Sequence, residues 1–444
     1  MRKANKASRP YSKTDPVVRA EFLNRIADRL SDKSSELIKT AVTETHLSEA
    51  RLKTELQRTA FQLKDYGNAA RSIMGIIKES AAPNCTRIIK KNHSIGPTVV
   101  FGASNFPFAY STAGGDTASA LAAGCPVIVK GHPAHIKTSR AIALLISECV
   151  TEFKLPEGTF QHAEGFEAGE ALVKHPFTCA VAFTGSLKGG RQLFYWGQQR
   201  QIPIPVFAEM GSINPVYILP GFKEDPGKMA SMLADSILNS SGQFCTKPGL
   251  IIATDDDFLQ SFKQALAGKI NEAQPAMLLH SGIFSEFSEK RERAKSMHGV
   301  SLLAGSDAEA AHGKGNPLLV ECDASAFIMD QALHEEVFGP FSIIVKCKNV
   351  MEMETVAGSL EGQLTSTVWG TKESLNHHES LIDEIRNKCG RMIFNGVPTG
   401  VTVCDAMHHG GPYPATTDSR FTSVGSDAIL RFCRPVSYQN WPDI

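Results

Sequence analysis

Apolar residues recur at helical spacing along the first seventy positions of the chain. From Val18 to Leu30 an apolar side chain stands at every fourth position, directly after Asp15 and Pro16, a pair typical of a helix start. Leucines repeat at helical spacing from Ser48 until Gly67, and Ser48 is a suitable N-cap. We therefore expect two long amphipathic helices that cover a sheet.

The pattern changes near residue 95 to short apolar or β-branched runs that end in glycine or a polar turn. These runs cover residues 98–101, 126–129 and 179–183, and a helical stretch follows each of them. Strands that alternate with helices predict an α/β fold with a doubly wound parallel sheet. The ligand crevice of such a sheet lies at the carboxyl ends of its strands.

A second region of the same texture begins at Val206. It contains the strand-like stretches 206–218, 250–253 and 340–345 and a helical stretch at 229–240. We expect a second doubly wound α/β domain here, and we expect residues 305–317 to form a surface loop.

Length and charge narrow the class of protein. At roughly 150 residues per domain, 444 residues leave room for two or three domains, each large enough to bury its own core. The 46 basic and 46 acidic side chains cancel, which removes the electrostatic term that nonspecific nucleic-acid binding needs. We therefore expect no nucleic-acid partner.

The distribution of apolar residues and cysteines favours a cytoplasmic protein. No apolar run approaches the roughly 18 to 20 residues of a membrane-spanning helix, and polar residues follow the basic N-terminus where an export signal would be apolar. The ten cysteines are dispersed without a C-x-x-C pair, so we expect neither a disulfide framework nor a zinc knuckle.

Three side chains that could carry chemistry follow predicted elements. Cys245 lies on a turn of small and polar residues, where a thiol can meet a substrate, although most cytosolic cysteines are apolar fillers. Glu209 ends a strand and could act as a general base, but spacing alone favours a solvated charge. Asn105 follows a strand and could donate to an oxyanion, although capping a turn is the more common role.

Other motifs give weaker signals. Residues 183–190 read as strand, glycine turn and helix with Ser186 as N-cap, which could bind a phosphate but match neither G-x-G-x-x-G nor a P-loop. His132 and His135 are separated by a proline that argues against a shared helical face, and we expect no metal. The segment 335–340 and the pair His408 and His409 have no decisive meaning alone.

In their order along the chain, these segments resemble the aldehyde dehydrogenase superfamily from about residue 17 to the end. The chain is most similar to the subgroup of α-ketoglutarate semialdehyde dehydrogenases and NADP-dependent fatty aldehyde dehydrogenases of luminous bacteria. The matching segments are FGASNFPFAYSTAGGDTASALAAGCPVIVKGHPAH from Phe101, PVFAEMGSINPV from Pro205, GQFCT from Gly242, EEVFGP from Glu335 and HHGGPYPATTDSRFTSVG from His408.

The resemblance implies a catalytic cycle and its residues. Cys245 would attack the aldehyde, Asn105 would hold the resulting alkoxide, hydride would pass to a nicotinamide, and Glu209 would activate the water that hydrolyses the thioester. His408 or His409 would assist. The implied cofactor-binding residues are Lys130, Gly185, Ser186, Gly190, Glu336 and Phe338.

The resemblance also implies a cofactor and a substrate. Residues 132–135 hold no carboxylate where the family commonly binds the ribose 2′-hydroxyl, which favours NADP, with NAD also used. We expect oxidation of α-ketoglutarate semialdehyde (2,5-dioxopentanoate) to 2-oxoglutarate. The alternatives are a long-chain fatty aldehyde, an acyl transfer to coenzyme A, and a catalytically idle scaffold with the same fold.

The implied domains are a cofactor-binding domain of residues 1–208, joined by 405–444, and a catalytic domain of residues 209–404. Relatives form homodimers or tetramers through a sheet. Because the termini are short, we expect that sheet to lack terminal strands, which argues against the family's assembly here.

Overall fold

The computed structural model of the chain describes residues 1–83, 85–306 and 313–442. These residues form two compact units. Unit 1 comprises Met1–Glu209, Thr402–His408 and Arg420–Ile444, and unit 2 comprises Met210–Val401 and His409–Ser419. The sequence-based division placed Glu209, residues 402–404 and residues 409–419 in the opposite domains. Glu209 lies in unit 1 because its strand pairs with the preceding strand of that unit through Glu209 itself.

Unit 1 is built on a five-stranded parallel sheet with the order β5-β4-β3-β6-β7. Its strands are β3 (Thr98–Phe101), β4 (Val127–Lys130), β5 (Phe160–Ala163), β6 (Ala180–Thr184) and β7 (Val206–Glu209). The central strand β3 is fully buried, as a strand covered on both faces should be. The expected runs at 98–101, 126–129 and 179–183 are therefore strands, two of them shifted by one residue.

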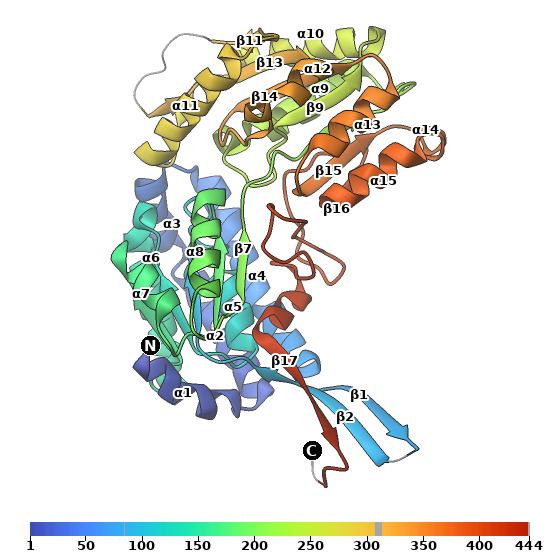
Figure 1. Cartoon of the computed structure of the whole chain (residues 1–444). Coiled ribbons are helices and arrows are strands. Elements are labelled where there is room, and N and C mark those ends of the chain that lie inside the picture. The colour runs from blue at the N-terminus through green and yellow to red at the C-terminus, as the bar shows by residue number, and fades with distance from the viewer. Residues whose placement is uncertain (84, 307–312, 443–444) are drawn as a thin grey trace. The chain divides into compact units, whose positions relative to one another are not determined.

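Helices surround this sheet, and two of them begin where the sequence predicts (Figure 1). In α2 the Asp15 carboxylate accepts a hydrogen bond of 2.8 Å from the Val17 N–H, and in α4 the Ser48 hydroxyl caps the Arg51 N–H. The helices of unit 1 are α1 (Arg2–Ser12), α2 (Pro16–Asp32), α3 (Ser34–Thr45), α4 (Glu49–Ile73), α5 (Gly115–Ala122), α6 (Ile136–Glu152), α7 (Glu167–Lys174) and α8 (Leu187–Gln198), with 3₁₀ turns η1 (Pro133–His135) and η4 (Ser426–Phe432).

A second, antiparallel sheet of unit 1 has the order β1-β2-β17 and is visible in Figure 1. Its strands are β1 (Ile76–Ala82), β2 (Cys85–Ser94) and β17 (Cys433–Gln439). The expectation that the C-terminal strand is missing from this sheet is wrong, because β17 pairs with β2 along its whole length. The alternation of partly buried and exposed residues in 433–439 is weak, which hid this strand in the sequence.

Unit 2 contains a seven-stranded sheet with the order β11-β13-β14-β9-β8-β15-β16, antiparallel only at the β11 edge. Its strands are β8 (Val216–Ile218), β9 (Leu250–Thr254), β11 (Val300–Gly305), β13 (Leu318–Asp323), β14 (Phe341–Cys347), β15 (Gln363–Trp369) and β16 (Cys389–Phe394). A separate two-stranded sheet pairs β10 (Ala276–Met277) with β12 (Lys314–Gly315). Strand β12 lies near the end of the predicted surface loop 305–317, and residues 307–312 of that loop lie outside the described residues.

Both faces of the unit 2 sheet are covered by helices. Successive strand residues point to opposite faces, so Val216 and Ile218 join one apolar core while Tyr217 joins the other. The helices are α9 (Pro226–Leu238) and α10 (Asp257–Glu272) on the first face, and α11 (Ser281–Ser296), α12 (Ala324–Met329), α13 (Val350–Ser359) and α15 (Glu379–Lys388) on the second, with α14 (Lys372–His377) and turns η2 (Asn239–Gly242) and η3 (Gln331–His334) beside them. Unit 2 is therefore the second doubly wound domain that the sequence predicts.

Within the described part of the chain, the search for a helix long and apolar enough to cross a membrane finds none.

Candidate active site

The candidate residues of unit 1 lie at the carboxyl ends of its parallel strands. Lys130 and Glu209 are the last residues of β4 and β7, Gly185 follows β6, and Asn105 lies in the loop after β3. Strand pairing places Phe101 opposite Lys130 and Thr184 opposite Glu209. The structure therefore brings all four to one edge of the sheet, where an open α/β sheet binds its ligands.

Asn105 is held by helix α4. Its side chain is 8% exposed, and its backbone carbonyl accepts a hydrogen bond of 2.7 Å from Arg51. The Glu55 carboxylate fixes the same loop by accepting from the Phe108 and Ala109 N–H groups at 2.8 and 3.0 Å. Two backbone clamps on one helix thus orient the Asn105 amide.

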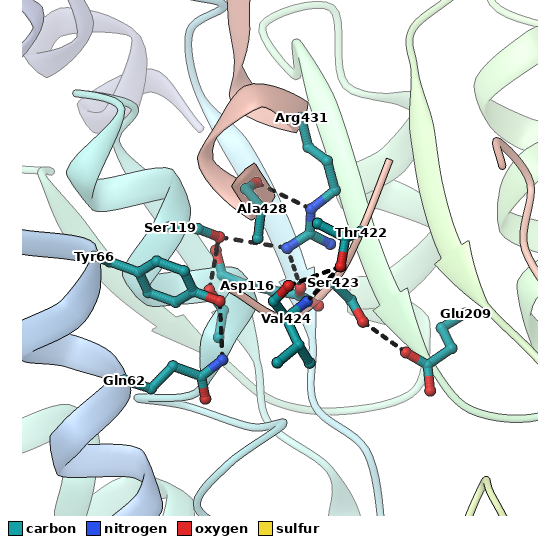
Figure 2. Close-up of polar contacts among 11 residues, drawn as sticks. Gln62, Tyr66, Asp116, Ser119, Glu209, Thr422, Ser423, Val424, Ala428 and Arg431 are labelled. Carbon is teal, nitrogen blue, oxygen red and sulfur yellow. Dashed lines mark hydrogen bonds and ion pairs between the residues drawn. The ribbon is translucent and has the colours of Figure 1, made fainter. Parts of the chain in front are cut away.

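Glu209 is 4% exposed and belongs to a buried polar network (Figure 2). Its Oε2 accepts a hydrogen bond of 2.8 Å from the Ser423 hydroxyl. Nearby, Asp116 forms a 2.8 Å ion pair with Arg431, and the negative charge of Glu209 raises the pKa of Asp116 in addition to the larger effect of burial. The carboxylate at the end of β7 is therefore not the solvated charge that spacing alone favoured.

The turn between β6 and α8 is shaped for a close approach to its backbone. A Cβ at Gly185 would lie 2.6 Å from the Phe183 ring, so only glycine lets this ring pack under the turn. The Ser186 hydroxyl caps α8 by accepting a hydrogen bond of 3.2 Å from the Gly189 N–H. The Gly190 N–H donates to the Ser186 carbonyl oxygen at 2.9 Å, as in the first turn of a helix. The positive end of a twelve-residue helix therefore faces the carboxyl edge of the sheet.

These residues fit a dinucleotide. Lys130 is half-buried, and burial lowers the pKa of its amine, while the α8 N-terminus on the same edge suits a pyrophosphate. The described residues of unit 1 thus place a cation after β4 and a helix N-terminus after β6, the two strands that flank the central strand β3.

In unit 2 the candidate nucleophile follows an unusual turn. Ser240, Ser241 and Gly242 have φ angles of 50°, 56° and 67°, three left-handed residues in succession. A Cβ at Gly242 would lie 2.2 Å from the Gly339 carbonyl oxygen, so glycine is required there. This compact turn leaves the Cys245 side chain half-buried rather than sealed in the core.

His409 lies beside Cys245. Its Nε2 is 3.8 Å from the Cys245 Sγ, and its side chain is 1% exposed. The glycines that follow His409 let the backbone pass close to the sheet of unit 2, because a Cβ at Gly411 would lie only 2.2 Å from the Gln363 carbonyl oxygen. Of the two histidines in the motif, His409 is the one that shares unit 2 with the thiol, whereas His408 belongs to unit 1.

Asn214 ties the nucleophile segment to the sheet. Its Nδ2 donates to the carbonyl oxygens of Cys245 and Lys247 at 2.8 and 3.0 Å, and its Oδ1 accepts from Thr365 at 3.0 Å. Asn214 adopts a left-handed φ of 50°, a conformation that asparagine tolerates. Sequence reasoning missed this residue, as it missed Ser423, although both lie inside the motifs that carry the resemblance.

Glu336 and Phe338 lie in the segment between η3 and β14 of unit 2, and both side chains are half-buried. A Cβ at Gly211 would lie 2.8 Å from Glu336 Oε2, so the carboxylate packs against this glycine. Burial raises the pKa of Glu336 and lowers the pKa of the fully buried Lys247. The positive charge of Lys247 lowers the pKa of Glu336, and the negative charge of Glu336 raises the pKa of Lys247, so each charge partly offsets the effect of burial on the other. The Lys247 amine donates to the carbonyls of Val337 and Phe341.

Comparison with known proteins shows the family of this chain. The model of the aldehyde dehydrogenase family matches residues 1–431. The chain belongs to the aldehyde dehydrogenase family.

Two curated members of this family are similar over most of the chain. "Alpha-ketoglutaric semialdehyde dehydrogenase 2" of Azospirillum brasilense is 41% identical over 96% of this chain and 83% of the relative. "Alpha-ketoglutaric semialdehyde dehydrogenase" of Acinetobacter baylyi is 40% identical over 97% of this chain and 84% of the relative. The alignments therefore cover most of this aldehyde dehydrogenase and most of each relative.

A solved structure shows the same fold. The 1-pyrroline-5-carboxylate dehydrogenase from Thermus with bound NAD superposes with a TM-score of 0.85 and 19% identity, over 99% of this chain and 84% of that one. The two doubly wound domains predicted for this aldehyde dehydrogenase from sequence are thus those of the family fold.

Proposed function

We propose that this enzyme oxidises α-ketoglutarate semialdehyde (2,5-dioxopentanoate) to 2-oxoglutarate with NAD(P), through a thioester on Cys245. The observation that carries the proposal is the Cys245 thiol, half-buried on a glycine-built turn with His409 Nε2 at 3.8 Å. The similarity to two enzymes named for this semialdehyde supports the substrate.

Each protein group has one task in the proposed reaction. The His409 imidazole accepts the thiol proton, and the Cys245 thiolate adds to the aldehyde carbon to form a thiohemiacetal. The Asn105 amide donates a hydrogen bond to the developing oxyanion, as the Cys245 backbone N–H does. After oxidation to the thioester, Glu209 takes a proton from water, the hydroxide attacks the acyl carbon, and the Cys245 thiolate leaves.

When bound, a dinucleotide would supply the acceptor for the hydride that leaves the thiohemiacetal carbon. Lys130 would hold the adenosine ribose, Gly185, Ser186 and Gly190 the pyrophosphate, and Glu336 with Phe338 the nicotinamide ribose. NADP is the preferred form and NAD also serves, because no carboxylate stands in 132–135 to repel a 2′-phosphate. The enzyme acts in the cytoplasm, an inference supported by the nine cysteines whose side chains the structure describes, none of which is in a disulfide.

The proposal is tested by comparing kcat/KM for 2,5-dioxopentanoate and decanal, each with NAD and NADP. We expect the semialdehyde with NADP to give the highest value, and we expect Cys245→Ala to lose at least a thousandfold in turnover. Cys179→Ala is the matched control, because this thiol is also half-buried but lies just before β6, at the end of that strand opposite Gly185. A higher kcat/KM for decanal, or turnover that survives in Cys245→Ala, would contradict the proposal. Formation of acyl-CoA after addition of coenzyme A would show that coenzyme A, rather than water, accepts the acyl group.

A further inference from the structure

A buried lysine joins the segment that carries Cys245 to the segment that carries Glu336. Lys247 follows Cys245 closely in the chain, and its side chain is 1% exposed. Its amine donates to the Val337 carbonyl oxygen at 3.1 Å and to the Phe341 carbonyl oxygen at 2.6 Å. Lys247 is therefore a point at which the nucleophile segment contacts the proposed cofactor segment of unit 2.

Other contacts already hold these two segments together. A Cβ at Gly242 would lie 2.2 Å from the Gly339 carbonyl oxygen, and the Ser342 hydroxyl donates to the Pro248 carbonyl oxygen at 2.7 Å. A neutral side chain with an N–H donor could also bond the carbonyl groups that Lys247 bonds. A buried ammonium ion carries a desolvation cost that such a neutral side chain would not carry, so its charge calls for a partner.

The partner on the cofactor segment is the Glu336 carboxylate. Burial raises the pKa of Glu336, and the positive charge of Lys247 has the largest effect among the charges that lower it. Lys290 of α11 lowers this pKa further, and it donates to the Glu336 carbonyl oxygen at 3.2 Å. A hydrogen bond from the Ser212 N–H also lowers the pKa, whereas the charge of Glu286 on α11 raises it. Burial lowers the pKa of Lys247 and the charge of Glu336 raises it, so each group favours the charged form of the other.

We propose that Lys247 is a positioning residue of the cofactor site: it keeps the Glu336 carboxylate negatively charged, so that Glu336 can accept hydrogen bonds from the hydroxyls of the nicotinamide ribose. The inference rests on the proposed function, which assigns Glu336 to this ribose. A carboxylate is a stronger acceptor than a protonated carboxyl group, because charge on the acceptor strengthens a hydrogen bond. Lys247 thus acts on the nucleotide through Glu336 and not by contact.

The first test measures NADP binding by calorimetry in the absence of aldehyde. Lys247→Gln removes the charge but can still donate to a carbonyl group, and we expect it to weaken NADP binding about tenfold at neutral pH. Its affinity for adenosine 2′,5′-bisphosphate, which lacks the nicotinamide ribose, should stay within about twofold of the native value. Lys263→Gln is the matched control, because Lys263 is a buried lysine of unit 2 that pairs with Glu321 of β13, and it should bind both ligands as the native enzyme does. The same titrations with NAD and AMP test an enzyme that prefers NAD.

A double-mutant cycle shows whether Lys247 acts through Glu336. Adding Lys247→Gln to Glu336→Gln should change the affinity for NADP by less than about twofold, because no carboxylate is left to keep charged. Lys247→Met should resemble Lys247→Gln, whereas Lys247→Arg keeps the charge and should recover part of the affinity. Equal losses from Lys247→Gln in the native and Glu336→Gln backgrounds would show a general effect on packing and overturn the inference.

The pH dependence of binding is a readout that a purely structural role of Lys247 would not move. In the native enzyme the affinity for NADP should fall toward acidic pH as Glu336 takes up a proton. In Lys247→Gln this fall should occur at higher pH, because burial then raises the pKa of Glu336 without opposition from the lysine. The charges of Lys290 and Glu286 and the ionisation of the nucleotide are common to both proteins, so an unchanged pH profile in Lys247→Gln would also overturn the inference.

These measurements separate failure of the inference from failure of the proposed function. No aldehyde is present, so the results do not depend on the substrate or on the chemistry of Cys245. NADP affinity that is kept in Glu336→Gln would refute the proposed role of Glu336, and the inference with it. Affinity that is lost in Glu336→Gln but kept in Lys247→Gln would refute the inference alone.

Discussion

At the scale of single residues, the hydroxyl of Ser423 holds one oxygen of the Glu209 carboxylate (Figure 2). A donor to a carboxylate stabilises its charged form and fixes its orientation. We therefore expect Ser423→Ala to slow steady-state turnover by about 5- to 10-fold. The acid limb of the turnover profile should also move to higher pH, because the base then loses its proton less readily.

Rapid mixing checks this expectation at the step in which we propose that Glu209 acts. In the proposed reaction deacylation follows hydride transfer, so Ser423→Ala should keep a burst of one reduced cofactor per Cys245 while the later phase slows. Ser423→Thr keeps the hydroxyl and should resemble the native enzyme, and so should Ser426→Ala, whose hydroxyl bonds Asp405 at the surface. A burst lost in proportion to turnover, with an unmoved pH profile, would show that Ser423 has no part in positioning the base.

Residue type and order along the chain were enough to predict Cys245, Glu209 and Asn105 as candidates, but not their surroundings. Ser423 lies 214 positions from Glu209, and no spacing rule relates two residues so far apart. His409 could not be chosen over His408 because the choice depends on how Gly410 and Gly411 pack on the sheet of unit 2. The Ser423–Glu209 contact and the position of His409 both depend on long-range packing, which the periodicity of the sequence does not encode.

At the scale of elements, Asn214 connects the start of β8 to the segment after η2 that carries Cys245. Asn214→Ala removes hydrogen bonds to two carbonyl groups of that segment and to Thr365, and leaves buried polar groups without them. We expect a loss of about 3–5 kcal/mol in the free energy of unfolding of unit 2.

The same variant should also change the chemistry of the thiol. With its segment released, Cys245 should lose its selective reactivity, so alkylation and turnover should both slow by at least tenfold. Asn376→Ala on the exposed helix α14 is the control for denaturation and alkylation alike. Native stability and native alkylation rates in Asn214→Ala would show that the Cys245 segment is held by other contacts.

Most strands and helices near the site could be predicted, because buried parallel strands are short apolar runs and helix starts carry their own caps. Asp15, Ser48 and Ser186 all cap helices as expected. Strand β17 could not, because its seven residues include polar Arg434, Ser437 and Gln439, and Pro435 interrupts the run. Its position depends on pairing with β2, more than 300 residues earlier.

At the scale of the whole molecule, Arg431 fastens the returning C-terminal segment to the helical layer of unit 1. Its buried guanidinium pairs with Asp116 of α5 at 2.8 Å. Arg431→Met leaves a buried carboxylate without its cation, and we expect it to cost about 3–5 kcal/mol in the free energy of unfolding. Thermal and urea unfolding of the native and variant chains would measure this loss.

The loss should depend on pH in a defined direction. Burial already raises the pKa of Asp116, and removing Arg431 raises it further, so the folded variant binds a proton that the unfolded chain has released. The stability of Arg431→Met should therefore fall as pH rises from the acidic range, and the deficit should be larger at pH 8 than at pH 5. Asp116→Asn combined with Arg431→Met should remove this dependence, and Arg434→Met on exposed β17 should behave as the native chain.

The path of the chain between the units has a consequence for biosynthesis. Unit 1 is made of the first 209 residues and of stretches that are translated only after most of unit 2. A ribosome therefore exposes the β2 edge and the carboxylate of Asp116 for more than three hundred codons before β17 and Arg431 emerge to cover them. During this interval unit 1 is incomplete and can be bound by chaperones. Unit 2 is nearly continuous in sequence, so its sheet can form as the chain leaves the exit tunnel.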